Sequence, residues 1–234
     1  MVFIRSLIFF LLQLVITPVY ALIAILTFPF HPVTRYRIIS GWALSMMWLL
    51  RAVCGIRMEV RGAENIPKQP CILLCKHQSA WETIALQKVF PPQVWVLKRE
   101  LLWLPFFGWG LAMTSPIAIK RSDGKGAVKQ LLRQGKERLD QGFCVVIFPE
   151  GTRIPYGKRG KYKIGGALLG ASTGVPVVPV AHNAGKLWGR NSFFKHPGVI
   201  TMSIGAAIDP AGLKAEEINQ RAEDWIEAEV ARMD

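Results

Sequence analysis

The hydrophobic and polar positions divide the chain near residue 55. Residues 7–30 contain no Asp, Glu, Lys or Arg over about 24 positions, which is long enough to cross a bilayer. A second apolar run, residues 38–50, holds two tryptophans but is too short to span. We expect residues 1–55 to form a membrane-anchoring helical hairpin that dips into one leaflet. A cleaved signal peptide ending near Ala21 and a buried hairpin of a soluble protein are the alternatives.

Beyond residue 55 the pattern changes to short β-rich runs separated by helical or turn-like segments. This alternation predicts an α/β domain over residues 56–234, with a mixed sheet flanked by helices. Apolar periodicity predicts helices at residues 125–140 and 214–233, and a third that begins at Ala80 and ends before Pro91. The predicted strands are residues 56–60, 71–75, 94–97, 116–119, 143–148, 175–181 and 199–204.

The distribution of charge along the chain favours some classes of binding partner over others. The net charge is +13, and residues 83–208 carry 18 basic against 5 acidic groups. A basic middle next to an apolar N-terminus favours anionic lipid or a phosphorylated substrate, and no zinc spacing or recognition-helix pattern favours nucleic acid. The four cysteines, three of which lie in apolar strands, are expected to be buried thiols in a reducing compartment. No metal site is predicted.

The first candidate for chemistry is residues 76–82, Lys-His-Gln-Ser-Ala-Trp-Glu, directly after a predicted strand. His77 can accept a proton from a hydroxyl, and Glu82 can bind its other ring nitrogen. Five positions on one continuous helix would separate the two side chains by about 140°, so they meet only if His77 lies in the preceding turn. Ser79 and Glu82 also match a capping box, which leaves Glu82 as either a helix cap or a partner of the histidine.

The second candidate is residues 148–153, Phe-Pro-Glu-Gly-Thr-Arg, which also follow a predicted strand. Gly151 allows close backbone approach, Thr152 offers a hydroxyl, and Arg153 carries a planar fork suited to phosphate. Alone, this segment could be an ordinary basic turn.

Together, these two motifs resemble the glycerophospholipid acyltransferases, particularly the 1-acyl-sn-glycerol-3-phosphate acyltransferases. Two further blocks agree in the same order: Lys-Arg-Glu-Leu at residues 98–101, followed by Pro105, Gly108 and Arg121, and Val-Pro-Val-Val-Pro-Val at residues 175–180. The resemblance covers residues 56–205. The family usually places Asp five positions after the histidine, whereas this chain has Glu82, whose longer side chain must fold back to reach the imidazole.

The resemblance implies acyl transfer from acyl-coenzyme A or acyl-carrier protein to the sn-2 hydroxyl of 1-acyl-glycerol 3-phosphate, giving phosphatidic acid. It implies no bound cofactor, and a bacterial inner-membrane location with the catalytic domain on the cytoplasmic side. Other acceptors, glycerol 3-phosphate or a lyso-ornithine lipid, stay open. By the same resemblance, His77 is the general base and Glu82 its partner. The acceptor site implied by the resemblance comprises Lys98, Arg121, Glu150, Gly151, Thr152 and Arg153.

Two rival hypotheses can be weighed. Residues 170–174, Gly-Ala-Ser-Thr-Gly, match a serine-hydrolase elbow, but residues 163–172 are predicted to be helical and no histidine follows Asp209. A non-enzymatic protein that binds anionic lipid would account for the charge and the hairpin, but it leaves His77 and Glu82 without a purpose. The residues 101–109, which are almost wholly apolar, could line a groove for an acyl chain or belong to the core.

Overall fold

The computed structural model describes residues 1–233, apart from the side chain of Arg121. Three helices precede the sheet: α1 (Val2–Leu26), α2 (Pro32–Ile39) and α3 (Gly41–Ala52). The second arm of the expected hairpin is therefore divided, with a break at Ser40. Tyr20 and Trp42 tie the two arms together, through hydrogen bonds of Tyr20 Oη with Ser45 Oγ (3.3 Å) and of Trp42 Nε1 to Thr17 Oγ1 (3.1 Å).

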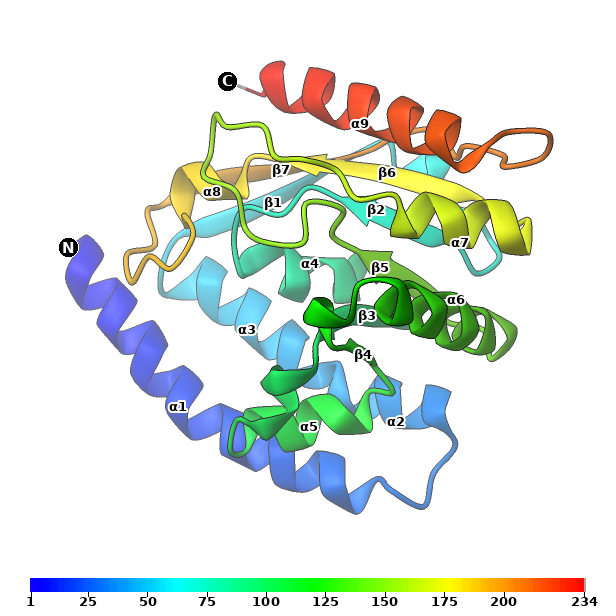
Figure 1. Ribbon diagram of the computed structural model, residues 1–234. Coiled ribbons are helices and arrows are strands. Elements are labelled where there is room, and N and C mark those ends of the chain that lie inside the picture. The colour runs from blue at the N-terminus through cyan, green and yellow to red at the C-terminus, as the bar shows by residue number, and fades with distance from the viewer. Residues whose placement is uncertain (234) are drawn as a thin grey trace.

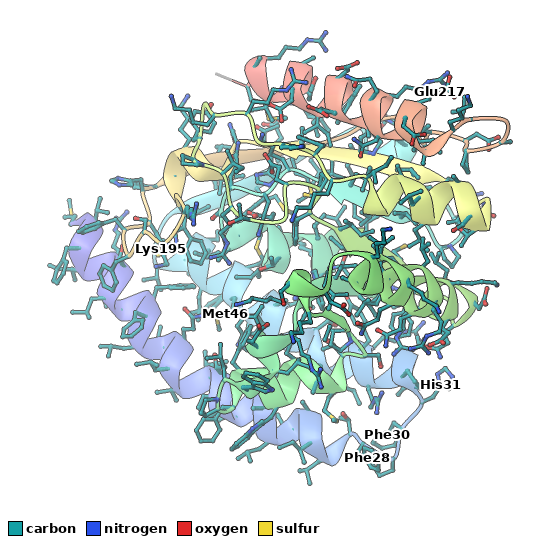
Figure 2. The ribbon with its side chains drawn as sticks, viewed as in Figure 1. Phe28, Phe30, His31, Met46, Lys195 and Glu217 are labelled. Atoms are coloured by element: carbon teal, nitrogen blue, oxygen red, sulfur yellow. The ribbon has the colours of Figure 1, made fainter. Side chains whose placement is uncertain are left out.

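Helix α1 presents a continuous apolar surface. It is the one helix in the described chain that is long and apolar enough to cross a membrane, and only 17% of its most apolar 18-residue window is buried. Phe28 and Phe30 project outward beyond its end (Figure 2). Its first half is anchored to the rest of the protein, because the Lys195 backbone N–H donates to Ser6 Oγ (3.0 Å) and Lys195 Nζ lies 5.0 Å from the centre of the Phe9 ring.

All seven predicted strands are present and form one mixed sheet. The spatial order is β1-β7-β6-β2-β5-β3-β4, and every neighbouring pair is parallel except β6 and β7. The central strands are fully buried, as expected for a sheet covered on both faces. The bounds are β1 Ile56–Arg61, β2 Ile72–Cys75, β3 Gln93–Lys98, β4 Ile117–Ile119, β5 Cys144–Ile147, β6 Val177–His182 and β7 Gly198–Ile204.

Helices cover both faces of this sheet (Figure 1). On one face α6, α7 and α9 lie in succession, with α7 against β2 and α9 against β6. On the other, α3 packs against α4 and β1, and α1 packs against α5. The division between residues 1–55 and 56–234 therefore stays a prediction, since the N-terminal helices contact the α/β part directly. The remaining helices are α4 (Trp81–Val89), α5 (Phe107–Met113), α6 (Lys125–Asp140), α7 (Gly165–Thr173), α8 (Ala184–Leu187) and α9 (Ala215–Ala231), with 3₁₀ turns at Ala63–Asn65, Arg99–Trp103 and Arg121–Asp123.

The order of the strands brings the two candidate motifs together. Strands β2 and β5 are parallel neighbours with Ile72 opposite Val145. Their carboxyl ends therefore lie at the same edge of the sheet, where open α/β folds bind ligands. Residues 76–82 and 148–153 begin at these two ends, although about 70 residues separate them along the chain.

Candidate active site

His77 lies at the sheet edge, in the turn between β2 and α4. Its ring stacks on Phe148, with centroids 4.1 Å apart and planes 16° from parallel. Its side chain is 13% exposed, so it reaches the surface of a cavity while its flanks are held by protein. Phe148 belongs to the second motif, so one aromatic contact fixes the two motifs against each other.

Glu82 reaches the histidine from the first turn of α4. Its Oε1 lies 2.7 Å from His77 Nδ1 and also accepts the backbone N–H groups of Gln78 (3.1 Å) and Ser79 (3.0 Å). The N–H of Trp81 in turn donates to Ser79 Oγ (3.1 Å). Glu82 therefore binds the imidazole and also closes the turn before α4, but the predicted capping box is not formed, because α4 begins at Trp81 and its N-cap, Ala80, makes no side-chain cap hydrogen bond.

The electrostatics keep this carboxylate ionised. Burial by itself raises the pKa of Glu82, but the hydrogen bonds from His77 and the Ser79 amide oppose that effect, and the pKa is lowered. An ionised Glu82 accepts a hydrogen bond from the Nδ1–H of His77, which leaves Nε2 as the nitrogen that can accept a proton from a substrate.

A second histidine, His182 at the end of β6, lies next to the pair formed by His77 and Glu82. The sequence patterns did not predict that it belongs to this site. It is fully buried, with Nε2 2.8 Å from the Lys76 carbonyl oxygen and 3.7 Å from Glu82 Oε2. Its Nδ1 accepts the Ala184 N–H (3.2 Å), which makes it the neutral Nε2–H tautomer. Burial lowers the pKa of His182, consistent with that neutral state. Nothing in its strand-like sequence context distinguished it from a core residue.

A cavity of about 350 Å³ opens beside His77. Its wall is largely apolar and comes from α1, α3, α4, β3, the Arg99–Trp103 turn and α5. Leu101, Phe106 and Phe107 of the apolar segment 101–109 line it, whereas Trp103 is 71% exposed. Some side chains of this segment therefore line the cavity, and others are exposed on the surface.

The predicted acceptor-site residues take different positions relative to the cavity. Lys98 and Arg153 line the cavity together with His77. The backbone of Arg153 is held by Arg190, whose Nη1 donates to the Arg153 carbonyl oxygen (3.0 Å). Thr152 is exposed beside them. The side chain of Arg121 lies outside the described part of the structure.

Gly151 and Glu150 occupy other positions in this loop. Gly151 has φ +69°, a left-handed backbone conformation that favours glycine. Glu150 is turned away from the cavity: its side chain is fully buried, with Oε2 accepting the His77 N–H (2.8 Å). Glu150 thus holds the backbone of His77 and does not line the cavity, and its place in an acceptor site stays a prediction.

The serine-hydrolase pattern has no matching geometry. Ser172 lies inside α7, and its hydroxyl donates to the carbonyl oxygen of Leu169 (3.0 Å) within the same helix. This position of Ser172 agrees with the rejection of the serine-hydrolase elbow in the sequence analysis.

Within residues 1–233, no group of three His, Cys, Asp or Glu side chains is arranged to hold a metal.

Comparison with known proteins gives one consistent result. A family model described as "Acyltransferase" matches residues 57–183. The chain is 48% identical over 235 residues to a 1-acyl-sn-glycerol-3-phosphate acyltransferase of Pseudomonas aeruginosa, covering 98% of this chain and 91% of that protein. It is 32% identical to the human 1-acyl-sn-glycerol-3-phosphate acyltransferase alpha, over 68% of this chain and 57% of that protein.

The fold also has a match among solved structures. The crystal structure of the 1-acyl-sn-glycerophosphate (LPA) acyltransferase PlsC of Thermotoga maritima superposes with a TM-score of 0.82, covering 98% of this chain and 95% of that one at 22% identity. At this identity the likeness shows a shared fold, including the helices that precede the sheet.

Proposed function

This chain belongs to the acyltransferase family, and from that premise we propose that it transfers a fatty acyl group to the free hydroxyl of 1-acyl-sn-glycerol 3-phosphate, giving phosphatidic acid. One observation carries the proposal: a carboxylate-bound histidine, His77, shares the wall of an apolar cavity with Arg153. The histidine suits proton transfer, the cavity suits a lipid chain, and the guanidinium suits a phosphate.

The reaction follows from the orientation of His77. The acceptor hydroxyl gives its proton to Nε2 while its oxygen attacks the thioester carbonyl, forming a tetrahedral intermediate. The C–S bond then breaks, and the departing thiolate takes the proton back from the imidazolium. Glu82 stays ionised throughout and stabilises the imidazolium through the 2.7 Å contact at Nδ1. The donor is proposed to be acyl-coenzyme A or acyl-carrier protein, so no covalent acyl-enzyme is needed.

Phosphate recognition is assigned to the basic side chains near the cavity. Arg153 and Lys98 approach from β5 and β3, and Arg121 follows β4 in the chain. A guanidinium binds phosphate in a bidentate manner, and two further cations would add to the local field. An uncharged or zwitterionic headgroup gains less from this site, which favours a phosphorylated acceptor over a lyso-ornithine lipid.

The decisive assay is acceptor-dependent thiol release. Purified protein in detergent is given palmitoyl-coenzyme A with 1-acyl-glycerol 3-phosphate, glycerol 3-phosphate or a lyso-ornithine lipid, and products are identified by mass. We expect phosphatidic acid from the first acceptor and little product from the others. Preferred acylation of another acceptor, or no transfer from coenzyme A and carrier-protein donors alike, would reject the assignment.

We propose that the apolar cavity holds the acyl chain of the donor, and changing its volume tests this. Leu111 of α5 lines the cavity. Leu111→Trp should raise kcat/KM for decanoyl- over palmitoyl-coenzyme A by about tenfold relative to the parent, since one or two methylenes in a pocket contribute about 1–3 kcal/mol. The matched control is Leu44→Trp on α3, an exposed position outside the cavity wall. An unchanged ratio in the Leu111 variant would place the acyl chain elsewhere.

We further propose that α1 attaches the enzyme to the cytoplasmic face of the bacterial inner membrane. Leu11 and Val15, one turn apart on α1, are 53% and 67% exposed. Leu11→Asp with Val15→Asp should abolish flotation with anionic phospholipid vesicles, because each carboxylate inserted near a helix centre costs about 2.5–3.5 kcal/mol. The control pair Leu11→Val and Val15→Leu should float normally. Undiminished flotation of the Asp variant would show that this face does not enter the bilayer.

A further inference from the structure

The residue before the catalytic histidine, Lys76, is charged and completely buried. Its Nζ lies 2.7 Å from Glu150 Oε1 and 2.6 Å from Glu227 Oε1. Burying an ammonium group costs several kcal/mol unless it is paired, and here two carboxylates from distant segments meet it. Glu227 lies on α9, 151 residues further along the chain.

The ion pair of Lys76 with Glu150 connects Lys76 to His77. One oxygen of this carboxylate faces Lys76, and the other accepts the backbone N–H of His77 at 2.8 Å. The His77 carbonyl oxygen accepts the Ile154 N–H (2.7 Å), so the backbone of His77 is fixed at both ends, by Glu150 of the second motif and by the residue that follows this motif. Burial raises the pKa of Glu150, and Lys76 opposes that rise. Without Lys76 this carboxylate would take up a proton more readily and bind the His77 N–H less strongly.

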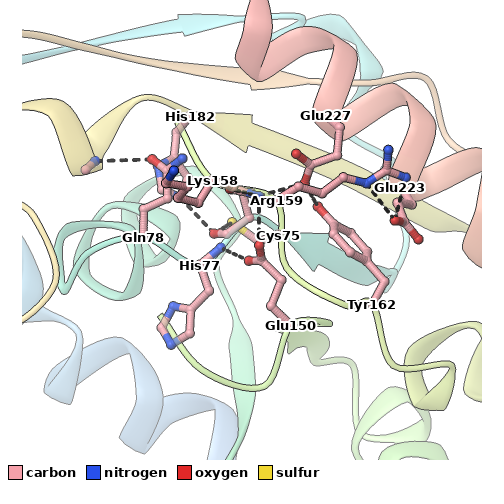
Figure 3. Close-up of polar contacts among 12 residues, drawn as sticks. Cys75, His77, Gln78, Glu150, Lys158, Arg159, Tyr162, His182, Glu223 and Glu227 are labelled. Atoms are coloured by element: carbon pink, nitrogen blue, oxygen red, sulfur yellow. Dashed lines mark hydrogen bonds and ion pairs between the residues drawn. The ribbon is translucent and has the colours of Figure 1, made fainter. Parts of the chain in front are cut away.

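Helix α9 completes the cluster from the opposite side. Glu227 Oε1 also accepts the hydroxyl of Tyr162 (2.7 Å), and Lys76 Nζ donates to the Lys158 carbonyl oxygen (3.4 Å). Nearby, Glu223 of α9 pairs with Arg159 (2.7 Å). These contacts hold the loop 151–164, which carries Arg153, against α9. Figure 3 shows the His77 ring pointing away from Glu150 and Glu227, and His77 lines the cavity.

We propose that Lys76 and Glu227 are positioning residues for His77, and that α9 thereby belongs to the functional part of the enzyme. This inference rests on the proposed acyl transfer. Neither residue lines the cavity, so neither is placed to contact the donor or the acceptor. Glu227 also lies beyond residues 57–183, the span matched by the family model. The cluster sets the position of the base and not the affinity for substrate.

The variants Lys76→Met and Glu227→Gln test the cluster, with Glu216→Gln as the matched control because Glu216 is an exposed residue of the same helix. Lys76→Met should lower kcat per folded molecule by about 10- to 100-fold while both KM values change less than about threefold, since small misplacements of a reacting group cost up to about 10²-fold. Glu227→Gln should lower kcat by about three- to tenfold, because the amide still offers an oxygen to Tyr162. Glu216→Gln should match the parent.

A purely structural cluster would give a different pattern. If Lys76→Met melts at a lower temperature but its folded fraction retains the parental kcat, the proposal is overturned. Should Lys76→Met fail to fold, Glu227→Gln and Tyr162→Phe decide, and parental kcat in both would overturn it. A readout that needs no turnover is the rate of His77 modification by diethyl pyrocarbonate, followed by peptide mass. We expect it to change more than threefold in Lys76→Met even if the parent proves inactive on lysophosphatidate, whereas an unchanged rate contradicts the positioning role.

Discussion

Replacing His77 by alanine should lower kcat by about 10²- to 10⁴-fold, the usual contribution of a positioned general base. His77 is the one histidine on the described cavity wall, and its Nδ1 is already hydrogen-bonded to Glu82. The loss should fall on kcat, with KM for both substrates nearly unchanged, because alanine removes an interaction made in the transition state. Thiol release from palmitoyl-coenzyme A with 1-acyl-glycerol 3-phosphate measures both constants.

The matched control for this variant is His196→Ala, which removes an exposed histidine near the start of β7. It should retain parental kinetics. If His77→Ala kept more than a tenth of the parental kcat while folded, the base would have to be sought elsewhere, with His182 the nearest candidate. Because His182 is fully buried, that outcome would also require the cavity to be rearranged.

Removing the charge of Glu82 is expected to have the second largest effect. Glu82→Gln should lower kcat by about 10²- to 10⁴-fold, because the imidazolium loses its counter-charge and the tautomer of His77 is no longer fixed. The isosteric amide keeps one oxygen for the N–H groups of Gln78 and Ser79, so the turn before α4 should survive. Circular dichroism and melting temperature check the fold, and the acyl-transfer assay measures kcat. A Gln variant with kcat within threefold of the parent would reduce Glu82 to a helix cap.

Glu82→Asp sharpens the same test. The family usually has Asp at this position, but in this structure the longer side chain spans to His77 Nδ1 at 2.7 Å. The Asp carboxylate is one methylene shorter, so it should not reach both the imidazole and the Ser79 N–H. We expect at least a tenfold loss of kcat. Full activity would mean that the turn at residues 77–80 adjusts to either length.

Sequence reasoning succeeded where the signal is local. The helix Lys125–Asp140 was predicted to the residue, because its apolar and basic faces repeat with the period of a helix. The seven strands were recognised as short apolar runs between turn signals. The proximity of His77 and Glu82 also followed from local geometry, since five positions bring the side chains together only when a turn precedes the helix.

Other features needed the tertiary structure. The resemblance implied that Glu150 belongs to the acceptor site, which stays a prediction, but its contact with Lys76 was not indicated by the sequence. Glu227 has the sequence environment of an exposed helical glutamate. Its neighbours in sequence do not indicate its contact with Lys76, a buried residue 151 positions earlier. The second arm of the N-terminal hairpin breaks at Ser40, which apolar content alone did not indicate.

The sequence by itself determined the elements, because these depend on periodicities within about twenty residues, and its ordered motifs indicated the reaction class. It also predicted that His77 is the base and Glu82 its partner. Only the tertiary structure decided which charged residues line the cavity and which pair with one another. That distinction depends on the order of the strands, which sets β2 beside β5 and β6, and on the packing of α9 against β6. A buried ion pair is stable only when distant segments bring its partners within about 3 Å, so local sequence contains no record of it.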